Sequence, residues 1–161
     1  MSDISETTGE EFYSGDWEKV KMVLSVLNIE EGKIATITQP TVNNYQEMVD
    51  REVDAILEDT YHVPLRAMNQ MQPDGVTRRV FPGDVRRYTR YWAASLLLLN
   101  EFQQLAQNTN EQATTYIEDS RRQIYAMKRF THRIPGMERK SHLSRTVPPN
   151  FQPPFLPEQD F

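Results

Sequence analysis

The chain has 161 residues, and its 18 Lys and Arg against 23 Asp and Glu give a formal charge of −5, a length that fits one domain of ordinary size. The absence of cysteine excludes disulfides, thiolate nucleophiles and cysteine-bound zinc, and it leaves three histidines as candidate bases or metal ligands. The longest apolar stretch, residues 93–99, is far shorter than the ~20 residues that span a bilayer. We therefore expect a soluble protein that is made in the cytoplasm and has no membrane partner.

Charge and proline are distributed unevenly along the chain. Residues 1–32 contain eight acids and two lysines, whereas residues 121–145 contain eight bases and one acid. Five of the ten prolines fall within the last fourteen residues. This segregation predicts three parts: a flexible acidic N-terminal arm over 1–15, a helical bundle domain over 16–130, and a basic and then proline-rich extended C-terminal arm over 131–161.

The first half of the predicted bundle contains two segments with the apolar periodicity of amphipathic helices. The first begins after Asp16, which is a good N-cap, and ends near Gly32. The second begins at Thr38 and ends at 62–63, because Pro64 disfavours the helical conformation in the residue before it.

The second half contains a loop and two further amphipathic segments. In the loop, residues 73–75 read Pro-Asp-Gly, a turn signal, and the residues after it could form an extended piece or an arm of a β-hairpin. The third helix is expected over 83–106, and the fourth opens with a capping box of Thr109 and Gln112 and ends near residue 130. The sequence therefore predicts an all-α protein, a small bundle of about four helices with extended N-terminal and C-terminal arms, in which a short β-hairpin can lie between helices two and three.

The sequence contains no recognisable catalytic or cofactor motif. The glycines are nowhere spaced to cradle a phosphate, and the three histidines lie on separate segments without metal-ligand spacing. Four acids on one side of the second helix could bind a metal or exchange protons; this acid face comprises Glu47, Asp50, Asp54 and Glu58. Because nothing partners these acids into a site, a solvated helix face is the favoured interpretation, and we expect no enzymatic activity, no metal and no cofactor.

Two features near the C-terminal end favour contacts with other molecules. A basic segment could bind phosphates or an acidic protein surface, and protein contact is favoured because the whole chain is acidic. The basic segment comprises Arg121, Arg122, Lys128, Arg129, Arg133, Arg139, Lys140 and Arg145. The tail then alternates prolines with large apolar side chains, a pattern typical of an extended segment that docks into pockets of a partner. Its candidate docking residues are Pro148, Pro149, Phe151, Pro153, Pro154, Phe155, Leu156, Pro157 and Phe161.

The end of the second helix has the pattern hydrophobic-Asp-x-x-Leu-x-x-x-Tyr-x-Val-Pro-Leu, formed by Val53, Asp54, Leu57, Tyr61, Val63, Pro64 and Leu65. This motif resembles the signature of the head-to-tail connector proteins of tailed bacteriophages, also called adaptor or head-completion proteins, and the architecture over about residues 17–130 is similar. The resemblance implies a structural virion protein that assembles as a ring, usually dodecameric, beneath the portal and continues the DNA channel toward the tail. It also implies the partners: the portal protein, a tail or neck protein, further copies of the chain, and viral DNA that passes without specific binding. The location would be the virion neck, after assembly in the host cytoplasm.

Three expectations follow for such a ring. The acid face could line the channel and repel DNA phosphates, and the extra apolar surface around Trp92, Leu97 and Leu98 could bury subunit interfaces. The tail, residues 141–161, could hold the portal or a neighbouring copy of the chain. The alternative from a different class is a nucleic-acid-binding protein that uses the basic segment from Arg121 to Arg145. A metal-dependent regulatory enzyme built on the acid face is a third hypothesis, to which the sequence lends little support.

Overall fold

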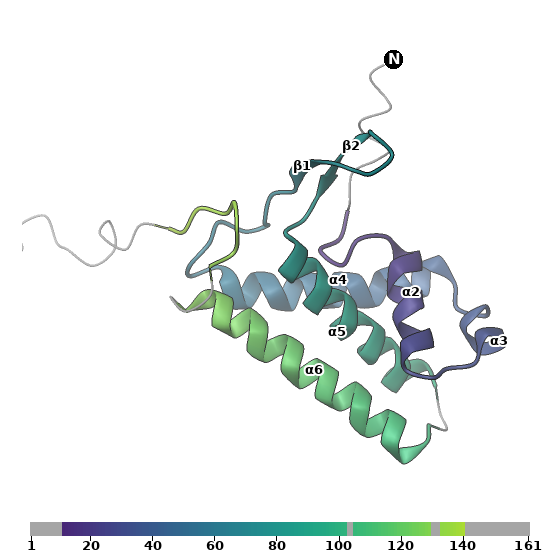
Figure 1. Cartoon of the computed structure of the whole chain (residues 1–161). Helices are drawn as coiled ribbons and strands as arrows, with labels where there is room; N and C mark the ends of the chain where they lie inside the picture. Colours follow the sequence, from purple (N-terminus) through teal and green to yellow (C-terminus); the bar gives the residue numbers. More distant parts are fainter. Residues whose placement is uncertain (1–10, 103–104, 130–132, 141–161) are drawn as a thin grey trace, which may run out of the picture.

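The computed structural model describes residues 11–102, 105–129 and 133–140, which form a mostly helical domain with one small antiparallel sheet (Figure 1). The order of elements in these residues is α2 (Trp17–Val26), α3 (Glu31–Ile34), α4 (Gln39–Leu57), β1 (Met68–Met71), β2 (Thr77–Val80), α5 (Gly83–Glu101) and α6 (Gln107–Lys128). The expected helical bundle with a short hairpin is confirmed at this level. Within the described residues, no helix combines the length and the apolar character needed to cross a membrane.

Helix α5 forms the centre of the core, because it packs against α2, α4 and α6. Trp92, Leu97 and Leu98 are all fully buried within the single chain. The expectation that they supply apolar surface to a subunit interface is therefore wrong. A helix with apolar residues on more than one face must bury the second face, and here the neighbouring helices of the same chain cover it.

The first two helices end earlier than the sequence predicts. Helix α2 ends at Val26, and Asn28 then adopts a left-handed backbone conformation with φ of 60°, so the segment up to Gly32 is split and a separate one-turn helix follows. Helix α4 ends at Leu57 instead of 62–63. Turn residues 58–60 follow, and Tyr61 then forms an antiparallel β-bridge with Arg139, so the chain has left the helical path before Pro64.

The boundary between α5 and α6 also differs from the prediction. Helix α5 ends at Glu101, because Phe102 adopts an extended backbone and packs against the core. Helix α6 begins at Gln107, and the residue at its N-cap, Ala106, makes no side-chain capping hydrogen bond. The predicted capping box is therefore wrong, because Thr109 already lies inside the helix.

The β-hairpin between α4 and α5 is confirmed, and it stands away from the helices (Figure 1). Met68 pairs with Val80 at its base and Met71 pairs with Thr77 near its tip. The turn is made by Gly75, whose φ of +81° suits glycine, and by Asp74, whose carboxylate accepts a hydrogen bond from the backbone N–H of Val76 at 3.0 Å. The Pro-Asp-Gly signal thus has the expected turn chemistry.

The two predicted arms are partly packed against the bundle. Tyr13 is only 3% exposed and Ser14 only 1%, so the prediction of a flexible arm that reaches residue 15 is wrong for this stretch. At the other end, Ile134 and Met137 are buried, so residues 133–140 also belong to the packed unit. A buried aromatic or aliphatic side chain removes apolar area from water, and these few residues are enough to attach otherwise polar segments.

Candidate functional site

The motif residues lie together at the C-terminal end of α4 and in the loop that follows it. Val53, Leu57, Tyr61 and Leu65 are buried, with exposed fractions of 4% or less. Pro64 is exposed, and its peptide bond to Val63 is cis. The expectation that the chain turns back at the proline so that Leu65 packs on the bundle agrees with this arrangement.

Tyr61 anchors the segment 133–140. Its hydroxyl oxygen accepts hydrogen bonds from the backbone N–H of Ile134 at 3.1 Å and from Nε of Arg139 at 3.2 Å. Beside it, Lys140 donates from its backbone N–H to the carbonyl of Thr60 at 2.7 Å. A hydroxyl that is buried with two donors to satisfy is a strong positional constraint, so the motif tyrosine determines where the C-terminal segment leaves the domain.

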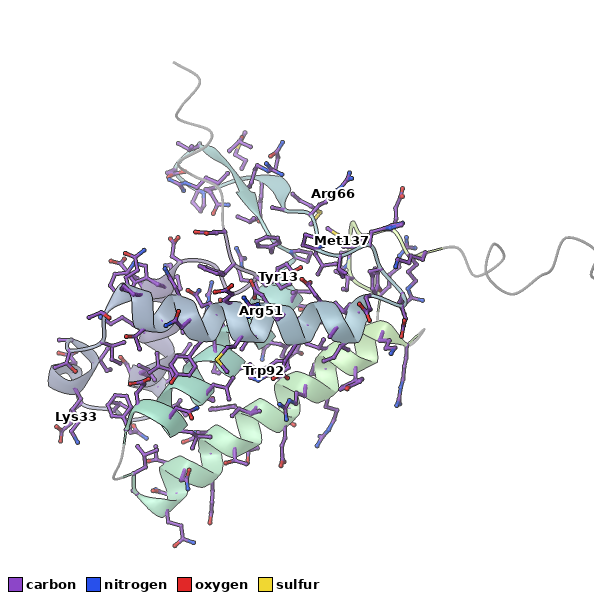
Figure 2. The ribbon with its side chains drawn as sticks, turned by 180° about the vertical axis from the view of Figure 1, so that it is seen from behind. Tyr13, Lys33, Arg51, Arg66, Trp92 and Met137 are labelled. Atoms are coloured by element: carbon purple, nitrogen blue, oxygen red, sulfur yellow. The ribbon has the colours of Figure 1, made fainter. Side chains whose placement is uncertain are left out.

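A second tyrosine, Tyr13, anchors the N-terminal segment to the same helix. Its hydroxyl donates to Oδ1 of Asp54 at 2.5 Å and accepts from the backbone N–H of Leu65 at 2.8 Å. Its own backbone N–H donates to Oδ2 of Asp50 at 3.1 Å, and its ring packs edge-on against Phe81 with centroids 4.9 Å apart. In Figure 2, Tyr13 lies on the side of α4 toward Met137, whereas Trp92 lies on the side toward α6.

One turn before Asp50 on α4, Gln46 lies on the same side of the helix and also contacts the N-terminal segment. Its Nε2 donates to Oγ of Ser14 and to the carbonyl of Gly15, both at 2.8 Å. We call Gln46, Asp50 and Asp54 the clasp, because they hold residues 13–15 along the helix. Arg90 of α5 completes the attachment by donating from Nε to the carbonyl of Ser14 at 3.0 Å.

The clasp perturbs the titration of its carboxyl groups. Burial raises the pKa of Asp50 to about 7, and the charges of Asp54 and Glu47 act in the same direction, while the hydrogen bond from the Tyr13 backbone opposes them. Burial also raises the pKa of Asp54, against the hydrogen bond from Tyr13. Within the described residues, Oδ1 of Asp50 and Oε1 of Gln46 have no hydrogen-bond partner, which fits a site that takes up a proton near neutral pH.

The acid face predicted from the sequence is therefore divided. Glu47 and Glu58 are exposed, and Glu47 forms an ion pair with Arg51 at 2.6 Å. Asp50 and Asp54 instead turn toward Tyr13. The interpretation of the four acids as one solvated helix face is wrong, and so is the expectation that all four line a channel, because Asp50 and Asp54 are used inside the subunit. Among the described residues, no three His, Asp or Glu side chains are placed to hold a metal ion.

Three of the eight cations of the basic segment are paired with acids of the same chain. Arg121 meets Glu52 of α4 at 3.2 Å, and Lys128 meets Asp59 at 3.1 Å. Arg122 meets Asp119 one turn away at 3.3 Å. Exposed pairs of this kind contribute little to stability, but they lower the net positive charge that α6 presents. Arg129 and Arg133 are exposed, and Arg145 lies outside the described residues.

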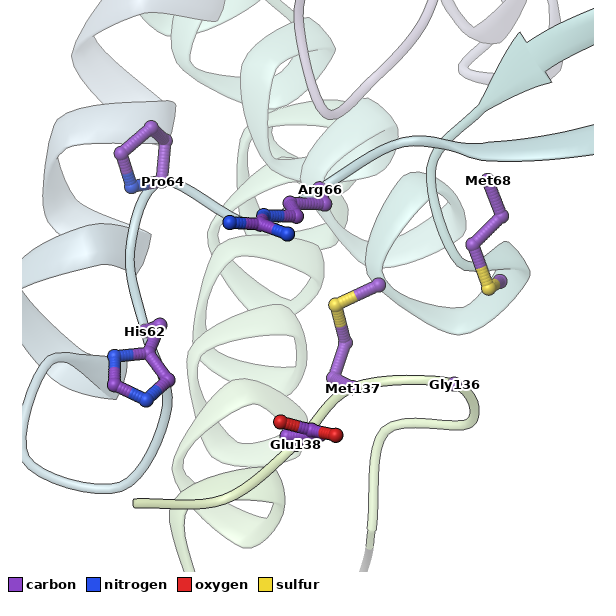
Figure 3. A pocket seen from close by; sticks show the side chains of 7 residues that line it. All are labelled: His62, Pro64, Arg66, Met68, Gly136, Met137 and Glu138. Carbon is purple, nitrogen blue, oxygen red and sulfur yellow. The ribbon is translucent and has the colours of Figure 1, made fainter.

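A cavity of about 520 Å³ lies beside the motif loop (Figure 3). Its walls come from the loop and hairpin base on one side and from the C-terminal segment on the other; the lining residues are His62, Pro64, Arg66, Met68, Gly136, Met137 and Glu138. Gly136 has φ of +76°, and a Cβ there would overlap the sulfur of Met68. Glycine suits this position because of its positive φ, and it leaves room for the side chain of Met68.

Several of the residues that attach the N-terminal and C-terminal segments to the bundle carry no recognisable signal in the sequence. Tyr13 lies in an acidic segment with few apolar residues, which is typical of disorder, and Met137 follows a proline and a glycine. The spacing of Gln46, Asp50 and Asp54 at four-residue intervals does place them on one helix face, but nothing in that pattern indicates that a distant segment lies across them.

The candidate docking residues from Pro148 to Phe161 lie outside the described residues. Comparison of the chain with protein-family models, with curated proteins and with solved structures found no match to any of them.

Proposed function

We propose that the chain is a structural virion protein, a head-to-tail connector subunit. In this proposal it forms a ring of twelve copies, as in the family it resembles, and joins the capsid portal to the tail. The observation that supports this best is the role of the motif residues. Tyr61 and Leu65, together with Asp54, hold the N-terminal and C-terminal segments at one end of the bundle. A rigid bundle with two chain segments anchored beside each other is suited to assembly through extended arms.

The partners in this proposal are further copies of the chain, the portal protein and a tail or neck protein, with viral DNA passing through the ring without specific binding. The site of action is the virion neck, and no enzymatic step or cofactor is involved. The exposed apolar residues Met22 and Val26 lie one turn apart on α2. Because the residues first expected at subunit contacts are buried in the core, this surface of α2 is the better candidate for a contact between copies.

The nucleic-acid-binding alternative has less support. Three of the cations in the basic segment are already paired with acids, so fewer counterions would be released on binding DNA. A connector subunit should bind its portal and ignore free duplex, whereas a DNA-binding protein should bind duplex with an affinity that falls steeply with salt.

The deciding experiment images the purified full-length chain by negative-stain electron microscopy, alone and mixed with its portal. We expect rings, or particles in which the chain extends the portal. A deletion of 148–161 should leave the bundle folded and abolish stable attachment, while Tyr125→Ala, a substitution of an exposed residue on α6, should change neither. A chain that never forms or joins a ring, in any condition, contradicts the proposal.

A further inference from the structure

A groove lined by tyrosines lies between α5 and α6, and it shares no lining residue with the cavity beside the motif loop. It has a volume of about 240 Å³ and is lined by Arg87, Tyr88, Tyr91, Tyr116, Asp119 and Ser120. The rings of Tyr91 and Tyr116 come from different helices and lie 5.1 Å apart at 50° to each other. Both rings are partly buried against the core, so the walls of this tyrosine groove are held in place by packing.

The chemistry of the groove matches a proline-rich segment. Grooves lined by aromatic side chains bind extended proline-rich peptides, which lose little conformational entropy on docking because their backbone is already extended. Beside these rings, the guanidinium carbon of Arg87 lies 5.7 Å from the centroid of the Tyr88 ring. Among the described residues, Arg87 forms no ion pair. The one acid of the lining, Asp119, is paired with Arg122 at 3.3 Å. The groove thus combines aromatic faces with a cation, Arg87, that can meet a carboxylate of a bound segment.

This chain contains such a segment. Residues 154–157 read Pro-Phe-Leu-Pro, which has the proline spacing that aromatic grooves recognise, and the acids Glu158 and Asp160 follow directly. The acids are complementary in charge to Arg87.

The segment can reach the groove of its own molecule. Lys140, the last residue described before the tail, is bonded to Thr60, and the hydroxyl of Thr60 in turn donates to the carbonyl of Lys128 at the end of α6. From Lys128 back to Ser120 is eight residues of helix, or about 12 Å. The fourteen residues from Lys140 to Pro154 span about 43 Å in an extended proline-type conformation. The reach therefore exceeds the helical distance severalfold.

We propose that residues 154–157 dock in the tyrosine groove of the same molecule, with Glu158 or Asp160 near Arg87. This inference goes beyond the proposed function and holds whether or not the chain is a connector. In a connector, the groove would compete with the portal for the tail, so that release of the tail becomes part of attachment.

The experiment places a photo-activated cross-linker in the full-length chain, as Phe155→benzoylphenylalanine, and maps the cross-linked peptides by mass spectrometry. We expect cross-links to residues 84–92 and 113–121. Tyr91→Ala should reduce their yield about fivefold or more, as for loss of an aromatic anchor, and Tyr125→Ala, outside the groove, should leave the yield unchanged.

A second variant protects the test against a simple loss of folding. Arg87→Glu changes an exposed side chain and should reduce the yield about twofold, and the additional changes Glu158→Lys and Asp160→Lys should restore it. Cross-links that map elsewhere, or a yield that is equal in all variants, would overturn the proposal. In a mixture of ¹⁴N and ¹⁵N chains, cross-links that join two copies would overturn the placement within one molecule. None of these results depends on ring formation, so the proposed function is tested separately.

Discussion

The clasp makes the stability of the protein depend on pH through Asp50. The pKa of its carboxyl is raised from 3.8 to about 7 in the folded chain. Between these values the folded state keeps a proton that the unfolded state has released. The free energy of unfolding contributed by this group therefore falls as the pH rises from about 4 to about 7, and it stays at its lower value above that range.

The size of the effect follows from the shift. Raising the pKa of Asp50 from 3.8 to about 7 corresponds to a loss of at most roughly 4 kcal/mol in the free energy of unfolding. Asp50 is only partly buried, so solvent screening reduces this figure, and we expect about 1–2 kcal/mol. The substitution Asp50→Asn keeps an oxygen that can accept from the Tyr13 backbone and removes the charge. It should raise the free energy of unfolding by that amount at pH 8 and leave it nearly unchanged at pH 4.

The assay is urea denaturation of the full-length chain and of the variant at half-unit intervals from pH 4 to pH 8. The difference between the two curves isolates Asp50 from the other titrating groups. Asp59→Asn removes an exposed carboxyl that faces Lys128 and serves as the matched control. If the difference between wild type and Asp50→Asn has no slope over this range, the buried proton on Asp50 does not exist.

Three further predictions concern packing. Tyr61→Phe leaves the buried N–H of Ile134 without an acceptor, which should cost about 1–3 kcal/mol and speed hydrogen exchange at that amide; unchanged exchange would contradict the anchoring role. Gly136→Ala places a Cβ against the sulfur of Met68 at a positive φ and should cost about 1–3 kcal/mol, measured by thermal unfolding; an equal or higher stability would show that the close approach is not constrained. Leu97→Ala should lower the free energy of unfolding by about 2–5 kcal/mol, because it leaves a cavity in the core, and it should not change the mass measured by light scattering. A variant that is as stable as the wild type but no longer forms oligomers would show that Leu97 lies in a subunit interface.

Helix existence was predictable from the sequence because apolar residues recur at helical spacing on α4, α5 and α6. The ends of the helices were not predictable to the same degree. Tyr61, which the sequence placed in the helix, instead pairs with Arg139, a residue 78 positions away, and local propensity contains no information about such a partner. The same limit applies to Thr109. It has the residue spacing of a capping box with Gln112, but α6 begins two residues before it.

The candidate site was predictable only in its central part. The motif around Leu57 and Tyr61 is visible as a sequence pattern, and its buried face follows from helical spacing. Tyr13 could not be assigned, because its stabilising contacts are with Asp54 and Leu65, both far along the chain. For the same reason, the sequence does not distinguish Asp50 and Asp54 from Glu47 and Glu58, because the segment that contacts the first two is distant along the chain.

The attachment of residues 133–140 also determines how a mechanical force would enter the domain. A pull on the chain beyond Lys140 meets the bonds to Thr60 and Tyr61 before it reaches the last turn of α6. The tension is thus shared between the ends of two helices, because Arg139 also donates to the carbonyl of Arg129 and Thr60 donates to the carbonyl of Lys128. A pull on the tail therefore loads the end of α4 and the end of α6 together, and these cross-connections must break before the last turn of α6 unwinds.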